Sequence, residues 1–207
     1  MAKTLDTRAK TLRMVQLAFL AALEVVLMLI YIPIGTINLN FGLVPIVIAG
    51  VLFGPVCGAM IGGVSGIVTM IQVLTGQSPF YLFLVATNPV AASLLCIIKT
   101  AAAGFLAGLV YKLFMKFSKF KAANVIASAV VCPVVNTGIF ALGMLAIFGK
   151  PLMENPDFSA LSGGSLVALV FVVLIGINFF VELALNVVLC PVISKALFMM
   201  KRSKSAQ

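Results

Sequence analysis

The sequence predicts an all-α integral membrane protein, a bundle of six transmembrane helices with both termini in the cytosol. Of its 207 residues, 63% are hydrophobic and only 9% are charged, whereas soluble domains have about 45–50% and about 25%. Its apolar stretches reach the roughly 20 residues that a helix needs to cross a hydrocarbon layer of about 30 Å. The whole chain, residues 1–207, is therefore expected to form a single membrane domain.

Prolines, glycines and polar clusters divide the apolar sequence into six predicted helices. The first ends where Pro33 and Gly35 interrupt the apolar pattern, and the second ends at Gly54 and Pro55. The predicted helices span approximately residues 12–32, 41–53, 57–74, 90–111, 122–148 and 165–199. Residues 36–40, 75–89 and 149–164 are predicted to be polar connections, the second of them a structured loop.

The basic residues determine the predicted orientation. The formal net charge is +9, but the lysines and arginines flank the apolar runs instead of forming a stripe that would bind nucleic acid. They gather before the first helix, at residues 112–121 and after residue 195, and Lys150 is the one basic residue in the connections on the other side. The positive-inside rule makes the basic side cytosolic, so the three polar connections are expected to face outward.

The residue types that most enzymes and metal sites need are missing or scattered. The chain has no histidine, the commonest general base and metal ligand, and its four cysteines form no Cys-x-x-Cys pair. Gly63-Val64-Ser65-Gly66 looks like the nucleophile box of rhomboid proteases, but a nucleophilic serine needs an activating base. No Walker A motif occurs. We therefore expect no enzyme activity, metal or cofactor, and ATP hydrolysis only on another chain.

Away from their ends, the predicted spans contain three acidic or basic side chains, Glu24, Lys99 and Glu182. A charge at the bilayer centre costs at least about 2.5–3.5 kcal/mol, so each of these groups needs a partner. Counted from Pro89, Lys99 lies about 15 Å deep at 1.5 Å per residue. Its ammonium fits a substrate carboxylate, but it fits Glu182 or Glu24 equally well, and the sequence leaves this choice open.

Amides lie at a comparable level in the fifth and sixth helices. Asn136 and Asn178 are about 18–20 Å from the ends of their helices, and Asn178, Glu182 and Asn186 share one helix face. Any one of these groups alone fits a role in joining helices, worth about 0.6–2 kcal/mol, whereas the set predicts a substrate-binding site. Further polar side chains are predicted at its outer mouth: Asn38, Asn40, Gln72, Gln77, Tyr81 and Asn88.

Small residues recur at a spacing of four, which allows close approach of helices. The glycines fit internal packing: Gly58, Gly62 and Gly66 in the third helix, and Gly104 and Gly108 in the fourth. Ala18 and Ala22 in the first helix differ, because their ridge can lie on the outside of the bundle. It is a candidate surface for docking another membrane subunit.

Several short segments form an ordered set along the chain. They are Ala18-x-x-x-Ala22, Ile37-Asn38-Leu39, Val44-Pro45-Ile46, Leu52-Phe53-Gly54-Pro55 with Gly58-Ala59, Lys99 ahead of Gly104, and Val135-Asn136-Thr137. With the plan of six helices, the set resembles the substrate-binding S components of energy-coupling factor (ECF) vitamin importers. The resemblance covers nearly the whole chain and is strongest to the pantothenate, riboflavin and folate branch.

The resemblance implies a high-affinity binder of a water-soluble vitamin, with the site beneath the outer loops and its walls on the last three helices, including Thr137. It also implies that the Ala18/Ala22 surface docks a transmembrane coupling subunit, which two cytosolic ATPases drive. Within this family, Lys99 favours a carboxylate-bearing ligand, and the scarcity of aromatic residues disfavours a large flat ring. Pantothenate is the expected substrate, and riboflavin or folate is the alternative. An unpaired Glu182 in the site would instead fit a cationic or amine-bearing substrate.

Two other classes of function remain open from the residues. A self-sufficient secondary transporter or channel would use Glu24, Lys99 or Glu182 for ion coupling. A structural membrane protein would use the polar layer only to hold its helices together.

Overall fold

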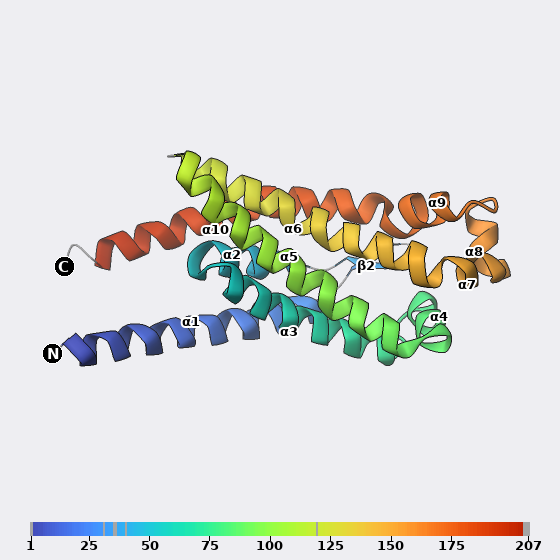
Figure 1. The fold of residues 1–207 in the computed structure, drawn as a ribbon, viewed down its shortest axis with the longest axis horizontal. Coiled ribbons are helices and arrows are strands. Elements are labelled where there is room, and N and C mark those ends of the chain that lie inside the picture. Colours follow the sequence, from blue (N-terminus) through green and yellow to red (C-terminus); the bar gives the residue numbers. More distant parts are fainter. Residues whose placement is uncertain (1, 31, 35–36, 40, 119, 205–207) are drawn as a thin grey trace.

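The computed structural model describes residues 2–30, 32–34, 37–39, 41–118 and 120–204. These residues form an elongated helical bundle with one small hairpin (Figure 1). Both ends of the chain lie at one end of the bundle, and α4, α7 and α8 lie at the other. The elements are α1 (Ala2–Leu29), β1 (Ile32–Ile34), β2 (Ile37–Leu39), α2 (Leu43–Phe53), α3 (Pro55–Leu74), α4 (Pro79–Thr87), α5 (Pro89–Phe117), α6 (Lys121–Gly143), η1 (Met144–Phe148), α7 (Gly149–Glu154), α8 (Pro156–Leu161), α9 (Leu166–Ala168), η2 (Leu169–Ile175) and α10 (Gly176–Lys204), where η marks a π-helical turn.

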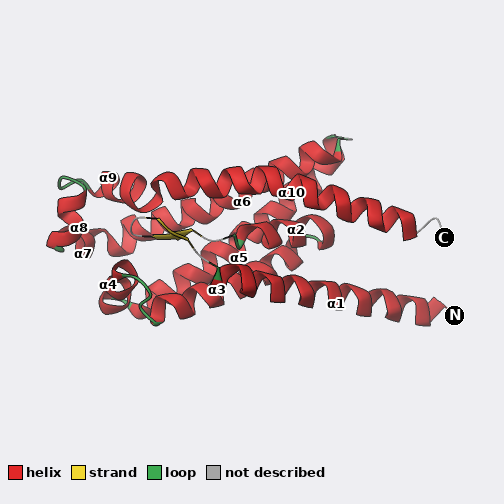
Figure 2. Ribbon diagram, turned by 180° about the vertical axis from the view of Figure 1, so that it is seen from behind, coloured by secondary structure: helices red, strands yellow, loops and turns green. Residues whose placement is uncertain are grey.

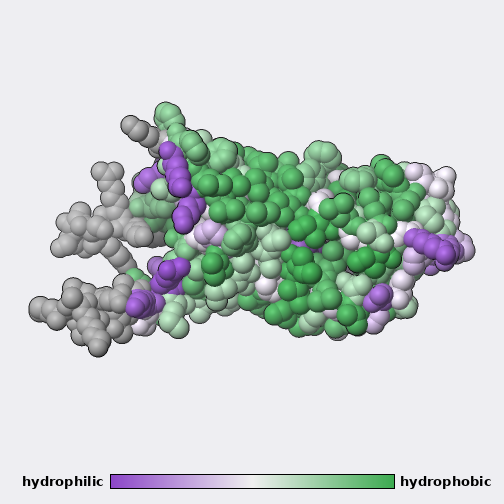
Figure 3. Space-filling view, in the orientation of Figure 1, coloured by the Kyte–Doolittle hydropathy of each residue, from purple (hydrophilic) through white to green (hydrophobic). Residues whose placement is uncertain are grey.

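Five helical segments of the described chain are long and apolar enough to cross a membrane. An apolar band covers the middle of the molecule, and polar residues gather at its two ends (Figure 3). The chain is therefore a multi-pass membrane protein. The five segments are Lys10–Leu29, Pro55–Leu74, Pro89–Phe117, Lys121–Glu154 and Leu166–Met199.

The predicted count of six spanning helices is not confirmed, because α2 has only 11 residues. At 1.5 Å per residue it is about 16 Å long, roughly half of the hydrocarbon thickness. Residues 43–51 are all buried, so α2 contacts protein instead of lipid and its length need not match the bilayer. Gly54, with φ of 98°, turns the chain sharply from α2 into α3, a conformation that favours glycine.

Two predicted connections contain short helices, α4 in 75–89 and α7 with α8 in 149–164. The polar and proline residues that indicated loops here start helices instead. Ser78 accepts a hydrogen bond from the backbone N–H of Tyr81 at 3.2 Å, ahead of Pro79 at the start of α4. Asn155 accepts one from the N–H of Asp157 at 3.0 Å at the start of α8. Both are N-cap arrangements.

The hairpin and the helix ends also differ from the sequence-based expectation. Ile32–Ile34 pairs with Ile37–Leu39 as an antiparallel hairpin, drawn in yellow beside the helices in Figure 2. β-Branched residues favour extended structure, and this signal was not recognised in the polar connection. The helices α1 and α5 extend into the charged flanks, to Ala2 and Phe117, because lysine and arginine are good helix formers.

The predicted glycine faces hold α3 and α5 together. These helices make the most extensive contact of any pair described. A Cβ atom at Gly62 would meet the carbonyl group of Thr100 and lie 3.1 Å from the Cα of Ala101, and one at Gly104 would meet the carbonyl group of Gly58. Backbone therefore lies directly on backbone, and a side chain at these positions would have to push two helices apart.

We expect Gly62→Ala to destabilise the bundle by about 1–3 kcal/mol, the usual cost of overpacking. Gly63→Ala is the matched control, because a Cβ there meets nothing within 4 Å. Thermal unfolding in detergent should show a lower Tm for the first variant and an unchanged or slightly higher Tm for the second. Equal Tm values for the two variants would contradict the close packing of α3 on α5.

Candidate functional site

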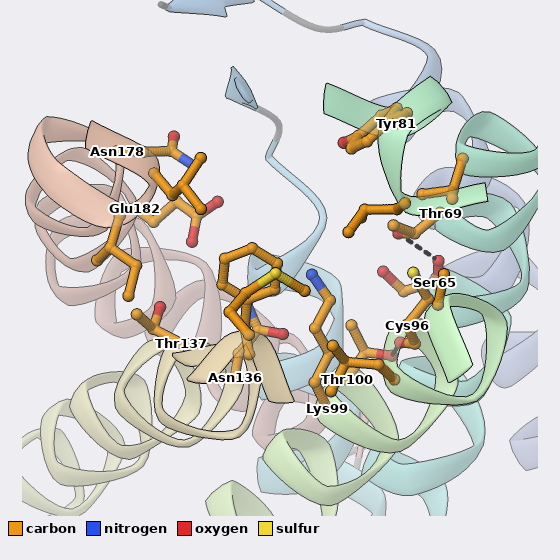
Figure 4. A pocket seen from close by; sticks show the side chains of 18 of the residues that line it. Ser65, Thr69, Tyr81, Cys96, Lys99, Thr100, Asn136, Thr137, Asn178 and Glu182 are labelled. Carbon is orange, nitrogen blue, oxygen red and sulfur yellow. Dashed lines mark hydrogen bonds between the residues drawn. The ribbon is translucent and has the colours of Figure 1, made fainter. Parts of the chain in front are cut away.

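A cavity of about 90 Å³ lies in the half of the bundle nearer α4. It is lined by α3, α4, α5, α6 and α10, with one residue each from α1, α2 and η1 and two from η2. Figure 4 shows the polar side chains converging on it from several sides. They are Ser65, Thr69, Tyr81, Lys99, Thr100, Asn136, Thr137, Asn178 and Glu182.

Lys99 supplies the positive charge of the cavity. It is half-buried on α5, and its Nζ lies 5.1 Å from the centroid of the Phe140 ring on α6. This cation–π contact holds the ammonium while leaving hydrogen-bond donors available. In Figure 4 the side chain extends into the space between the walls.

Glu182 supplies the negative charge from α10. This helix starts at Gly176, whose φ is 25°, and within its first two turns it presents Asn178 and Glu182 to the cavity. Glu182 is 8% exposed. Among the described residues, neither Lys99 nor Glu182 forms an ion pair. The structure therefore contains no ion pair between Lys99 and an acid among the described residues.

The predicted polar face of α10 divides along its length. Asn178 and Glu182 line the cavity, whereas Asn186 lies deeper, where its Nδ2 donates to the backbone oxygen of Glu182 at 2.8 Å and its Oδ1 accepts from Cys190 Sγ at 3.6 Å. The first turns of this face thus line the cavity, and its later turns take part in internal packing.

Two carboxamides beside the cavity lack partners. In the described part of the chain, the Oδ1 atoms of Asn136 and Asn178 are buried and accept no hydrogen bond. A buried acceptor left unpaired costs about 1–3 kcal/mol, so such atoms indicate a group that the protein itself does not supply. Thr137, next to Asn136, also lines the cavity.

The opposite wall carries hydroxyl groups. Thr69 donates to the backbone oxygen of Ser65 at 3.0 Å and Thr100 to that of Cys96 at 3.0 Å, which leaves the hydroxyl oxygens able to accept. Burial raises the pKa of Tyr81 to about 12, so its phenol stays neutral at physiological pH. Sequence reasoning had not placed Ser65, Thr69 or Thr100 in the site, although Ser65 and Thr69 have the helical spacing of one face.

Several residues predicted for the outer mouth are not on the cavity. Gln72 is buried but points away, because its Nε2 donates to the backbone oxygen of Met28 on α1 at 3.0 Å. Gln77 and Asn88 are exposed, and Asn88 caps α5 by accepting from the N–H of Ala91 at 3.0 Å. The side chain of Asn38 and the whole of Asn40 lie outside the described residues.

Glu24 lies behind the cavity rather than in it. Its side chain is fully buried on α1 next to Ser65, and a Cβ atom at Gly42 would lie 2.6 Å from its Oε1. Within the described chain neither carboxyl oxygen has a hydrogen-bond partner. Glu24 was one of the partners that the sequence left open for Lys99, and among the described residues the two form no ion pair.

The Ala18/Ala22 ridge lies on the outer surface. Both alanines are exposed on α1, which is the least buried of the five spans. Beside the ridge, an apolar groove of about 610 Å³ separates part of α1 from α2 and α10. No described element packs over the ridge.

Comparison with known proteins gives a family and a similar solved structure. The family model "ECF transporter, substrate-specific component" matches residues 12–194. A solved structure described as "Structure and mechanism of the S component of a bacterial ECF transporter" is 19% identical, with a TM-score of 0.50 over 95% of this chain and 96% of that chain. At this identity the likeness supports the fold alone. A search of curated proteins gives no match.

Proposed function

The chain belongs to the family of ECF transporter substrate-specific components, and from this premise we propose that it binds a compact, carboxylate-bearing vitamin for an ATP-driven importer. A component of this kind is a transport subunit and not an enzyme. Pantothenate is the first candidate for its substrate.

The observation that carries the proposal is Lys99. Its ammonium extends into the cavity and has no carboxylate partner among the described residues. A charge held in a largely apolar bundle is costly unless it is paired. A substrate carboxylate would provide the missing counter-charge, and Asn136 and Thr137 on the neighbouring helix would hydrogen-bond it.

The size of the cavity supports pantothenate over the larger vitamins. Its volume of about 90 Å³ is well below the roughly 300–1,000 Å³ of sites for drug-sized ligands. Pantothenate is short and flexible, with one carboxylate and three donors in its amide and two hydroxyls. Riboflavin and folate remain the alternatives, and their fused rings would require the walls to move farther apart than pantothenate would.

We propose that both termini are cytosolic and that the cavity opens toward the outside. The exposed basic residues of α5, α6 and α10 near the termini support this orientation through the positive-inside rule. The partners proposed for the chain are a transmembrane coupling subunit at the Ala18/Ala22 ridge and two cytosolic ATPases. In this arrangement α2 counts as the sixth helix, enclosed by the other five.

Uptake assays test this function directly. We expect membrane vesicles that contain this chain with a coupling subunit and both ATPases to accumulate labelled pantothenate when ATP is inside. Vesicles with the chain alone should bind pantothenate without accumulating it. Mass spectrometry of the ligand retained on the purified chain identifies the vitamin independently.

Two outcomes of these assays would contradict the proposal. Accumulation without any ATPase would indicate a secondary transporter. A purified chain that neither retains nor binds any vitamin would indicate a structural protein.

A further inference from the structure

The wall of the cavity opposite Lys99 is rich in hydrogen-bond acceptors. Glu182 and Asn178 come from α10, and the Oδ1 atom of Asn178 is unpartnered within the described residues. Figure 4 shows the Glu182 carboxylate directed into the space that the Lys99 ammonium enters from another side. The two charged groups share one cavity without pairing.

Glu182 is the decisive member of this wall. A carboxamide can turn to present either its oxygen or its nitrogen, but an ionised carboxylate only accepts hydrogen bonds. In the described part of the chain no donor reaches its carboxyl oxygens, and the one hydrogen bond that the residue makes beyond its helix ladder uses its backbone oxygen. A substrate that brought only a carboxylate would satisfy Lys99 and leave the buried carboxyl oxygens of Glu182 without a donor, which is costly.

We infer that the substrate carries, besides the anionic group bound by Lys99, a donor group for Glu182, either an ammonium or hydroxyls. The inference rests on the proposed function and narrows its substrate class from carboxylates to carboxylates with a donor-bearing far end. The Lys99 and Glu182 charges cancel, so the site as a whole suits a dipolar ligand. Asn178 accepts a further hydrogen bond from the same end.

A trio of acids with equal chain length separates the possibilities: valerate, 5-hydroxyvalerate and 5-aminovalerate. They share the carboxylate and differ only at the far end, which carries no donor, a hydroxyl or an ammonium. Binding of each acid to the purified chain is measured by titration at millimolar concentrations. We expect at least one donor-bearing acid to bind about tenfold or more tightly than valerate, as one charge-assisted hydrogen bond allows.

Glu182→Gln distinguishes the two donor groups, because glutamine keeps an acceptor oxygen of the same reach and removes the charge. If the donor is an ammonium, 5-aminovalerate loses about tenfold or more in affinity in this variant. If it is a hydroxyl, 5-hydroxyvalerate changes by less than about threefold, since the amide oxygen still accepts. The control is Glu154→Gln on α7, an exposed acid paired with Lys150 at 3.8 Å, which should change neither value.

Two results would overturn the inference. Equal binding of all three acids would show that no group in the cavity recognises the far end of the ligand. The carboxylate site of the proposed function would still be supported. Tighter binding of valerate to Glu182→Gln, without any preference for a donor-bearing acid, would make Glu182 a simple counter-ion of Lys99. Failure of all three acids to bind would instead reject the carboxylate site itself, and the proposed function with it.

Discussion

Lys99→Met should lower the affinity for a carboxylate vitamin by at least about 30-fold, enough to abolish binding in most assays. Truncating one partner of a buried charge pair costs about 2–5 kcal/mol or more, and every 1.4 kcal/mol is a factor of ten. Methionine keeps the apolar stem of lysine against Phe140 and removes the ammonium. The loss should be larger than a missing hydrogen bond explains, because Glu182 then faces the substrate carboxylate without compensation.

Titration of the purified variant with pantothenate measures this effect. Lys116→Ala is the matched control, since Lys116 is an exposed lysine of the same helix, about 25 Å along it from Lys99. The double variant Lys99→Met with Glu182→Gln tests whether Lys99 binds the substrate directly or only neutralises the charge of Glu182. Recovery of full affinity in the double variant, or unchanged affinity in Lys99→Met, would remove Lys99 from direct contact with the substrate.

Much of the polar layer was predictable because depth in a membrane helix follows from residue number. Counting along helices placed Lys99, Asn136 and Asn178 at similar levels, and the structure brings all three to one cavity. Glu182 followed from its helical spacing to Asn178. Each of these side chains is conspicuous, because polar groups are rare in apolar segments.

The direction in which a side chain points was not predictable in the same way. Gln72 and Thr69 are three residues apart on α3, yet Gln72 bonds to α1 and Thr69 lines the cavity. Which face of a helix meets which neighbour depends on packing across the whole bundle, and the sequence of one helix does not contain that information. Glu24 shows the same limit, since its depth was predicted and its separation from Lys99 was not.

The short helix α2 shows that hydropathy alone does not distinguish a membrane span from a helix buried in protein. Residues 41–53 are apolar enough to predict a span, but apolar residues are needed equally in lipid and in a protein core. Because α2 is enclosed by other helices, its length is determined by packing inside the bundle and not by the thickness of the membrane. The 13 residues of the predicted helix were already too few for a full span, and this length was the signal against one.

The helix that carries the ridge also contacts the residues around the cavity. Met28 on α1 lines the cavity, accepts from the Ser65 hydroxyl at 3.7 Å through its sulfur, and accepts from Gln72 through its backbone oxygen. Nearer the chain start, Arg13 donates to the backbone oxygen of Phe53 at 2.8 Å. Helix α1 is thus fixed at two levels on its inner side, while its alanine ridge is free of described contacts on its outer side.

Replacing both Ala18 and Ala22 with leucine should therefore reduce transport to less than about a tenth and leave vitamin binding unchanged. Small residues let the backbone of a partner helix come close, and overpacking at each of two positions costs about 1–3 kcal/mol. Leucine is a good helix former and is readily accepted by lipid, so the free subunit should fold normally. The variant should also fail to co-purify with the coupling subunit.

The measurement compares ATP-driven uptake in vesicles with titration of the purified subunit. Ala146→Leu is the control, because Ala146 is exposed on the span Lys121–Glu154 and has no predicted partner. Normal uptake by the double variant would place the coupling subunit on another surface. Loss of binding together with uptake would mean that the ridge supports the cavity through Met28, and docking would no longer be its explanation.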